Sequence, residues 1–206
     1  MDQKNEKQGN RIAFILAVLI IWAFIGHPIV YFSKSIEGTV VSDKTGKPID
    51  SAIVVAQWIL YQAGPGHGGH GPRLVVRETK TNSEGKFYFR GWGPRFRVPT
   101  TYLTSYSPGL YVFKGGYAPK FLTNNLESNN VIRDSDWDGK EIELGNRADE
   151  VKNHLGRINS FIFSLRNNRD DWREMPLMTE ALNMETEWFY RQGIARGYVA
   201  TVPKSN

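Results

Sequence analysis

The stretch that decides the fold is TKTNSEGKFYF, residues 79–89. Its centre, Asn82-Ser83-Glu84-Gly85, is a turn signal, because polar residues favour tight turns and glycine adopts positive φ without strain. The residues after the turn alternate, so that Phe87 and Phe89 share one face of a strand and Tyr88 lies on the other. The sequence therefore predicts a β-hairpin here, with both phenylalanines in a hydrophobic core.

Outward from this hairpin, further short runs have the same character. One run at residues 36–41 ends in a segment that contains Gly46 and Pro48, a second occupies 52–61, and a later one alternates at 141–144. Short alternating runs separated by turn residues are typical of an all-β sandwich or barrel. We therefore expect a mainly β domain over residues 33–145.

Four groups of residues carry a resemblance to a known family. They are IEGTV at 36–40, TGKPI at 45–49, TKTNSEGKFYF at 79–89 and LYVFKGGY at 110–117. Together they resemble the carboxypeptidase regulatory-like domain, over about half of the chain. The resemblance implies an antiparallel, transthyretin-like sandwich of about seven strands, and a domain that binds, braces or positions other molecules without catalysing a reaction.

An uncharged stretch at residues 12–32 indicates a membrane segment. Residues 12–25 are apolar without a break, and about 21 helical residues at 1.5 Å rise span about 31 Å, close to one bilayer core. Three basic residues precede the stretch within residues 1–11, whereas only Lys34 follows it closely. We expect a single-pass helix in a bacterial inner membrane, with residues 1–11 in the cytoplasm and residues 33–206 in the periplasm. A cleaved signal peptide is the alternative, although no small-x-small cleavage site follows.

The last part of the chain, residues 146–196, changes to a helical period. Its apolar residues recur every three or four positions, as on one face of an amphipathic helix; they are Val151, Leu155, Ile158, Ile162 and Leu165. Pro176 suits the first turn of a second helix. We expect this helical appendage to pack on itself or on the sandwich, and residues 197–206 to form a loose tail.

Composition and missing motifs restrict the function. The 206 residues include no cysteine, which excludes disulfides and thiolate metal sites. The net charge of +5 is spread evenly, so nucleic-acid binding is not expected. No metallopeptidase, nucleophile-elbow or phosphate-loop motif is present, and we predict no catalytic residue and no cofactor. We expect a non-catalytic, membrane-tethered binding or scaffold module for an envelope protein or glycan, the alternatives being a periplasmic metal-binding protein and a hydrolase with an unrecognised site.

Two clusters are candidate metal ligands. His67 and His70 lie in a glycine-rich insertion at residues 64–72, and imidazoles on a flexible loop suit copper, zinc or nickel. Three carboxylates occupy alternate positions before a glycine, as in the first half of a calcium loop; they are Asp134, Asp136 and Asp138. Each cluster lacks the ligands that complete a coordination shell, so a solvated hairpin tip and an acidic turn are the alternatives.

These clusters are distinguished by calorimetric titration of the chain with zinc and with calcium. We predict that neither ion binds more tightly than about 10 μM, because both shells are incomplete. Histidine ligands lose zinc as they protonate near pH 6.5, whereas carboxylates retain calcium there, so titrations at about pH 7.5 and about pH 5.5 separate the two sites. A sub-micromolar zinc affinity abolished by His67→Ala, or a calcium affinity abolished by Asp136→Ala, would contradict this prediction.

Overall fold

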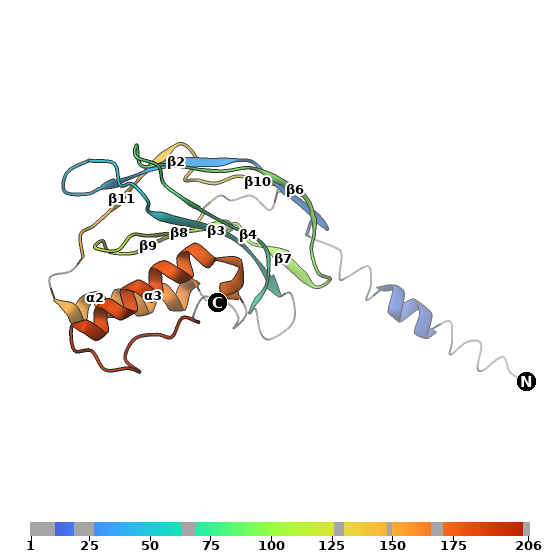
Figure 1. Cartoon of the computed structure of the whole chain (residues 1–206). Helices are drawn as coiled ribbons and strands as arrows, with labels where there is room; N and C mark the ends of the chain where they lie inside the picture. Colours follow the sequence, from blue (N-terminus) through green and yellow to red (C-terminus); the bar gives the residue numbers. More distant parts are fainter. Residues whose placement is uncertain are drawn as a thin grey trace, which may run out of the picture.

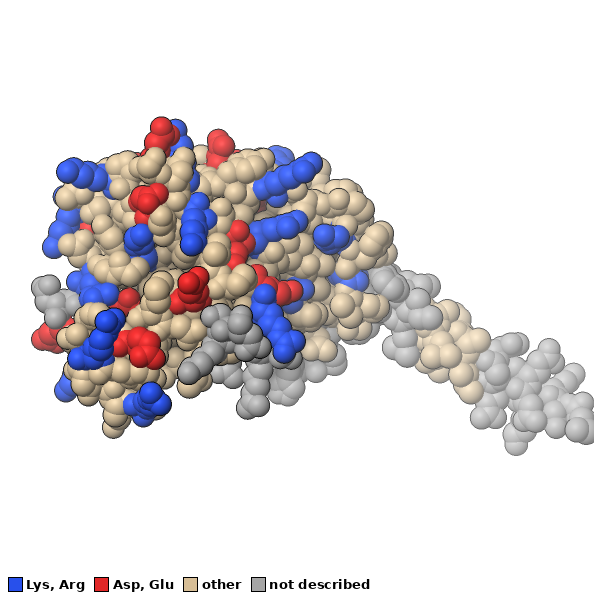
Figure 2. Space-filling model, viewed as in Figure 1, with Lys and Arg blue, Asp and Glu red and all other residues tan. Residues whose placement is uncertain are grey.

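The computed structural model describes residues 11–18, 27–62, 69–125, 130–147, 150–165 and 171–203. The fold is mainly β, with two layers of strands forming a sandwich and two helices covering the outer side of one layer (Figure 1). Lys and Arg side chains are interspersed with Asp and Glu over the face shown in Figure 2.

The first layer consists of two three-stranded sheets, ordered β10-β1-β6 and β11-β2-β5. Their strands are β1 (Val30–Ser33), β2 (Ile36–Ser42), β5 (Lys86–Phe89), β6 (Trp92–Phe96), β10 (Ile132–Arg133) and β11 (Lys140–Leu144). Strand β1 pairs parallel to β10, and β2 pairs parallel to β11. The expectation of a wholly antiparallel sandwich is therefore wrong for these two pairs. Parallel pairing needs a long crossover, and here the chain between the partners builds the second layer.

The second layer is a single sheet ordered β4-β3-β8-β9, with β7 also paired to β3. Its strands are β3 (Ile53–Gln62), β4 (His70–Lys80), β7 (Thr101–Leu103), β8 (Gly109–Phe113) and β9 (Lys120–Leu122). The described residues thus contain eleven strands where about seven were expected. Several of the additional strands are only two or three residues long, too short for an alternating sequence pattern to reveal.

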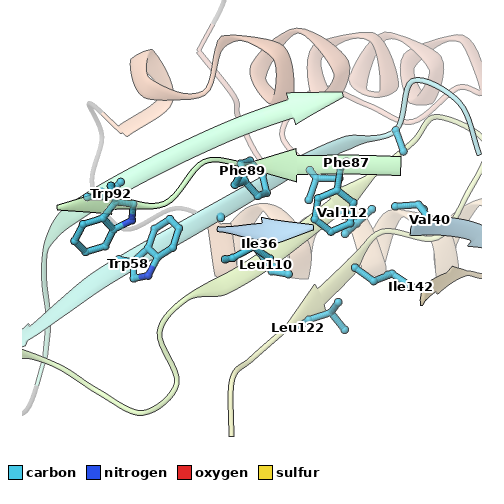
Figure 3. Close-up of a cluster of buried hydrophobic side chains, with 14 of the residues drawn as sticks. Ile36, Val40, Trp58, Phe87, Phe89, Trp92, Leu110, Val112, Leu122 and Ile142 are labelled. Atoms are coloured by element: carbon cyan, nitrogen blue, oxygen red, sulfur yellow. The ribbon is translucent and has the colours of Figure 1, made fainter. Parts of the chain in front are cut away.

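Strand β3 lies at the centre and is buried on both faces. Val54, Ala56 and Trp58 face the first layer and join the core between the layers. Figure 3 shows Trp58 in this core, beside Trp92. Ile53 and Val55 point the other way, into a second core beneath the helices. Strand β8 alternates in the same manner. A strand covered on both sides reads as a nearly continuous apolar run, as β3 does.

The predicted turn at residues 82–85 and the facing of the strand after it are confirmed, but the predicted hairpin is wrong. Strand β4 pairs with β3 and β5 pairs with β2, so the turn carries the chain from one layer of the sandwich to the other. Phe87 and Phe89 on β5 are 3% and 4% exposed, whereas Tyr88 is 56% exposed. Phe87 lies opposite Gly38 of β2, where an added Cβ would come within 2.8 Å of its ring. The glycine therefore makes room for the aromatic side chain in the core.

The helical appendage is confirmed as a layer over the second sheet. It consists of α2 (Val151–Leu165), the short 3₁₀ helix η1 (Asp171–Glu174) and α3 (Pro176–Arg191). The chain after α3 is packed rather than loose as far as residue 203: Val199 is 3% exposed, and the Ala200 amide donates to Asn159 Oδ1 at 2.8 Å. Residues 204–206 of the predicted tail lie outside the described residues.

The predicted membrane span at residues 12–32 overlaps the folded domain. Residues 11–18 are helical and residues 19–26 lie outside the described ranges, but β1 begins at Val30 and Tyr31 is completely buried. The His27 ring stacks on Tyr102 with centroids 4.1 Å apart. The domain therefore begins by residue 27, because apolar residues after it serve the core of the sandwich. None of the helices in the described ranges combines the length and apolarity that crossing a bilayer requires.

The N-terminus of α3 is anchored by a side chain from the sheet. Both carboxylate oxygens of Glu78 on β4 accept backbone hydrogen bonds, from Leu177 at 2.9 Å and from Met178 at 3.1 Å. The residue that precedes the helix, Met175, provides no side-chain cap. Glu78 thus satisfies two of the amide groups that a helix start leaves unpaired, and joins the helical layer to β4.

Replacing either core phenylalanine tests the strand register. We predict that Phe87→Ala and Phe89→Ala each lower the free energy of unfolding by about 3–5 kcal/mol, because each removes a buried ring. The matched Tyr88→Ala should change it by less than about 0.5 kcal/mol, since that ring faces solvent. Denaturant unfolding measures all three. Losses below about 1 kcal/mol for both phenylalanines would contradict the register.

Removing the Glu78 cap tests the docking of α3. Glu78→Ala should cost about 1–2 kcal/mol in thermal or denaturant unfolding, as other cap losses do, whereas Glu187→Ala on the exposed side of α3 should be nearly neutral. Burial raises the pKa of Glu78 from 4.5, against the opposing effect of its two backbone donors. The folded protein then holds this proton more tightly than the unfolded chain. The free energy of unfolding of the natural protein, relative to that of Glu78→Gln, should therefore fall as pH rises above about 4.5. An increase of this difference with pH would contradict the prediction.

Candidate functional site

A cavity of about 890 Å³ opens where the second sheet extends beyond the end of α2. We call it the aromatic groove. Its lining residues are Gln57, Ile59, Tyr61, Thr104, Tyr106, Ser107, Gly109, Tyr111, Phe121, Thr123, Phe163 and Ser164. They come from β3, β8, β9, the segment between β7 and β8, and the last turn of α2. The groove continues the sheet face that the helices cover elsewhere.

Aromatic rings form the walls of the groove. Tyr111 and Phe121 stack with centroids 4.4 Å apart. Tyr106 and Phe163 stand at the rim and are 57% and 83% exposed. Gly109 lies against the rings of Phe121 and Tyr111, and a Cβ there would approach the Phe121 ring to 3.1 Å, so the glycine leaves space beside these rings. The groove thus offers several ring faces to a ligand.

A buried side chain on β3 provides an unused hydrogen-bond acceptor. Gln57 is 1% exposed, and its Nε2 group donates to the Leu165 carbonyl at 3.4 Å and contacts Met175 Sδ at 3.2 Å. Its Oε1 atom is buried and has no hydrogen-bond partner among the described residues, and the same is true of Thr104 Oγ1. Buried polar atoms are nearly always paired in folded proteins. Both residues line the cavity, so it adjoins two polar groups that lack a partner within the described ranges.

Two buried polar residues hold the segment that carries Tyr106. Arg133 of β10 donates to the carbonyl groups of Thr104 and Ser107. Asn124 donates from Nδ2 to the same Ser107 carbonyl at 3.1 Å, and its backbone amide donates to Tyr106 at 3.3 Å. These bonds tie the segment to both layers of the sandwich. The groove is therefore formed in advance of any ligand, as a selective binding site requires.

The described residues that line the groove include no acid, base or histidine, although the Arg133 guanidinium donates to two carbonyl groups of its wall. Burial raises the pKa of Tyr111, and burial with the neighbouring Tyr102 and Tyr106 raises that of Tyr61. Both phenols therefore stay protonated at physiological pH. The Tyr111 hydroxyl donates to the Ser164 carbonyl at 2.8 Å, which joins the sheet to the end of α2.

The histidine pair predicted as a metal site is only partly described. His67 lies outside the described residues, and His70 is the first residue of β4, where its backbone lies opposite Tyr61. Within the described ranges, no three His, Asp or Glu side chains come together as metal ligands.

The three aspartates of the predicted calcium loop have separate partners. They lie in the turn that leads into β11. Asp134 contacts Lys34 Nζ at 3.1 Å, Asp136 accepts the Asn125 amide at 2.6 Å, and Asp138 accepts the Glu37 amide at 2.9 Å. These bonds give the turn a structural role, since they connect it to the start of β2 and to the segment after β9.

Sequence reasoning did not identify the aromatic groove. One signal was present: Gln57 interrupts the otherwise apolar run from residue 52 to residue 60, and a polar residue within such a run needs a buried partner. Tyr106 and Phe163 gave no signal, because isolated exposed aromatic residues are common on protein surfaces. They reach the groove only through the packing of α2 on the sheet.

No protein-family model matches the chain, and no curated protein matches it. Among solved structures, it resembles a streptococcal ancillary pilin at 14% identity and a TM-score of 0.28, over 55% of this chain and 29% of the pilin. It resembles 3-chlorocatechol 1,2-dioxygenase from Rhodococcus opacus at 14% identity and a TM-score of 0.29, over 56% of this chain and 60% of the enzyme. A shaft pilin domain from Lactobacillus rhamnosus aligns at 9% identity and a TM-score of 0.25, over 58% of this chain and 99% of the pilin domain.

The chain therefore spans less than two thirds of the length of the ancillary pilin and of the dioxygenase. At TM-scores this low, the three likenesses carry no argument about function. The β-sandwich follows from the pairing of the strands themselves, and the aromatic groove from its own residues.

Proposed function

We propose that this protein is a non-catalytic binding module whose aromatic groove holds an uncharged carbohydrate segment of the bacterial cell envelope. The observation that carries the proposal is the conjunction of exposed ring faces with the buried, unpaired Gln57 Oε1 in one neutral cavity. The uncharged stretch before residue 27 would tether the domain to the inner membrane, with the groove on the periplasmic side. The basic residues at 4, 7 and 11 support that orientation.

Carbohydrate chemistry matches the groove in two respects. A pyranose ring has faces of C–H groups that pack on aromatic rings, and a periphery of hydroxyl groups that donate and accept hydrogen bonds. Tyr106, Phe121 and Phe163 supply rings. Gln57 Oε1 accepts a hydrogen bond, and the Thr104 hydroxyl either donates or accepts one. A few fixed polar atoms in a mainly apolar pocket orient a ligand and give selectivity.

The neutrality of the groove favours an uncharged ligand. A charged group bound here would lose its hydration without an opposite charge among the lining residues, which is costly. The part of the lining that the structure describes also contains no carboxylate, whereas cleavage of glycosidic bonds ordinarily uses a pair of them. Both features support retention of a glycan over its hydrolysis.

Removing the rim tyrosine tests the proposal. We predict that the chain binds neutral β-1,4-linked oligosaccharides of glucose or N-acetylglucosamine, and that Tyr106→Ala weakens the binding about five- to tenfold through the loss of one stacking ring. Tyr88→Ala is the matched control, because Tyr88 is 56% exposed against 57% for Tyr106 and lies on the other layer. Titration calorimetry measures both. Failure of every neutral oligosaccharide to bind, or equal weakening by both variants, would overturn the proposal.

A second variant tests the polar floor. Gln57→Leu removes the buried acceptor and leaves a side chain of similar size. It should therefore weaken oligosaccharide binding without lowering the unfolding temperature appreciably. The Leu165 carbonyl retains the hydrogen bond from Arg73, at 2.6 Å. Unchanged affinity in a folded variant would remove Gln57 from the site.

A further inference from the structure

The outer face of the sheet β10-β1-β6 is apolar, and none of its three large apolar side chains is buried by the part of the chain that the structure describes. Phe32 on β1 lies beside Ile132 on β10, and Val30 lies beside Phe96 on β6. Phe32, Ile132 and Phe96 are 37%, 51% and 70% exposed. Soluble proteins rarely present adjoining large apolar side chains unless that surface meets a partner.

Arginine side chains border this face. A shallow depression beside Phe32 is lined by Arg77, Arg90 and Arg95, and its described lining residues include no carboxylate. Asp134, which follows β10 directly, contacts Lys34 Nζ at 3.1 Å. The border thus has a local excess of positive charge, although the charge of the whole chain is evenly spread.

The position of the face in the chain indicates what covers it. The exposed Ile29 precedes β1 directly, and the uninterrupted apolar residues 12–25 stand just before it in the sequence. Figure 1 shows that the chain enters the sandwich at the end where β6 lies. A surface that adjoins an apolar leader is held close to whatever that leader enters.

We propose that the apolar face of β10-β1-β6 and its three arginines rest on the surface of an anionic phospholipid bilayer. Phe96, Ile132 and Phe32 enter the boundary between headgroups and acyl chains, as the apolar side of an interfacial protein does. Arg90 and Arg95 contact lipid phosphates, with their aliphatic stems lying along the apolar surface. This inference is independent of the aromatic groove. It assigns the domain a fixed orientation on the membrane surface, in contrast to a domain that rotates freely about its membrane anchor.

The absence of cysteine from the chain allows a clean test with the full-length protein. Phe96→Cys carries a polarity-sensitive fluorophore, and Tyr198→Cys is the matched control, because the two positions are 70% and 71% exposed and Tyr198 follows α3 in the helical layer. The protein is reconstituted in phosphatidylcholine vesicles with and without phosphatidylglycerol. Flotation reports attachment to the vesicles, and shielding of the label from acrylamide reports contact of the apolar face with lipid.

We expect a blue-shifted emission and several-fold lower quenching at position 96 in vesicles that contain phosphatidylglycerol, and neither change at position 198. Arg90→Gln and Arg95→Gln should each reduce the lipid-bound fraction of the face about fivefold, the effect of one surface arginine near anionic lipid, while flotation persists. An unshielded label at 96, equal shielding at 198 or equal shielding in pure phosphatidylcholine would overturn the proposal. Shielding of the label by inorganic phosphate alone would identify a site for free anions and would overturn the proposal. Shielding without vesicles at high protein concentration would identify a second copy of the chain as the partner, and would overturn it as well.

Discussion

Burial of β3 on both faces is the constraint on which the rest of the structure depends. A strand with apolar side chains on both sides needs a cover on each, and one sheet supplies only one. The first layer covers Val54, Ala56 and Trp58, while α2 and α3 cover Ile53 and Val55. The helical appendage is therefore part of the core of this domain, and the Glu78 contacts with the start of α3 hold the helices on the second sheet.

The aromatic groove results from the limited extent of this helical cover. Helix α2 ends at Leu165, and beyond it the helix-facing side of β3 continues through Ile59 to Tyr61. Gln57 marks the transition from covered to open sheet. An unpaired buried acceptor costs about 1–3 kcal/mol, and natural proteins accept such a cost mainly at functional sites. The position of Gln57 thus links the packing of the core to the binding proposal.

Several elements depended on contacts between residues far apart in the sequence. In the sequence, Tyr31 lies near the end of an uncharged segment. In the structure it is fully buried, and its hydroxyl accepts a hydrogen bond from the Leu103 amide at 3.2 Å. The parallel pairing of β2 with β11 joins residues about a hundred positions apart, and no local pattern reports such a pairing. Residues 197–203 looked loose because their partners, Asn159 and Asn183, lie on the helices.

Elements with a strong local period could be predicted from the amino-acid sequence. The turn at Gly85, the inward Phe87 and Phe89, and the helices from Val151 and Pro176 all follow from turn chemistry and apolar spacing, because neighbouring residues alone set these features. The strand order, the separation of β4 and β5 into different layers, the start of the domain by residue 27 and the aromatic groove depend on the tertiary structure. Each of these features arises where segments far apart in the sequence come into contact. A local sequence pattern does not report such contacts.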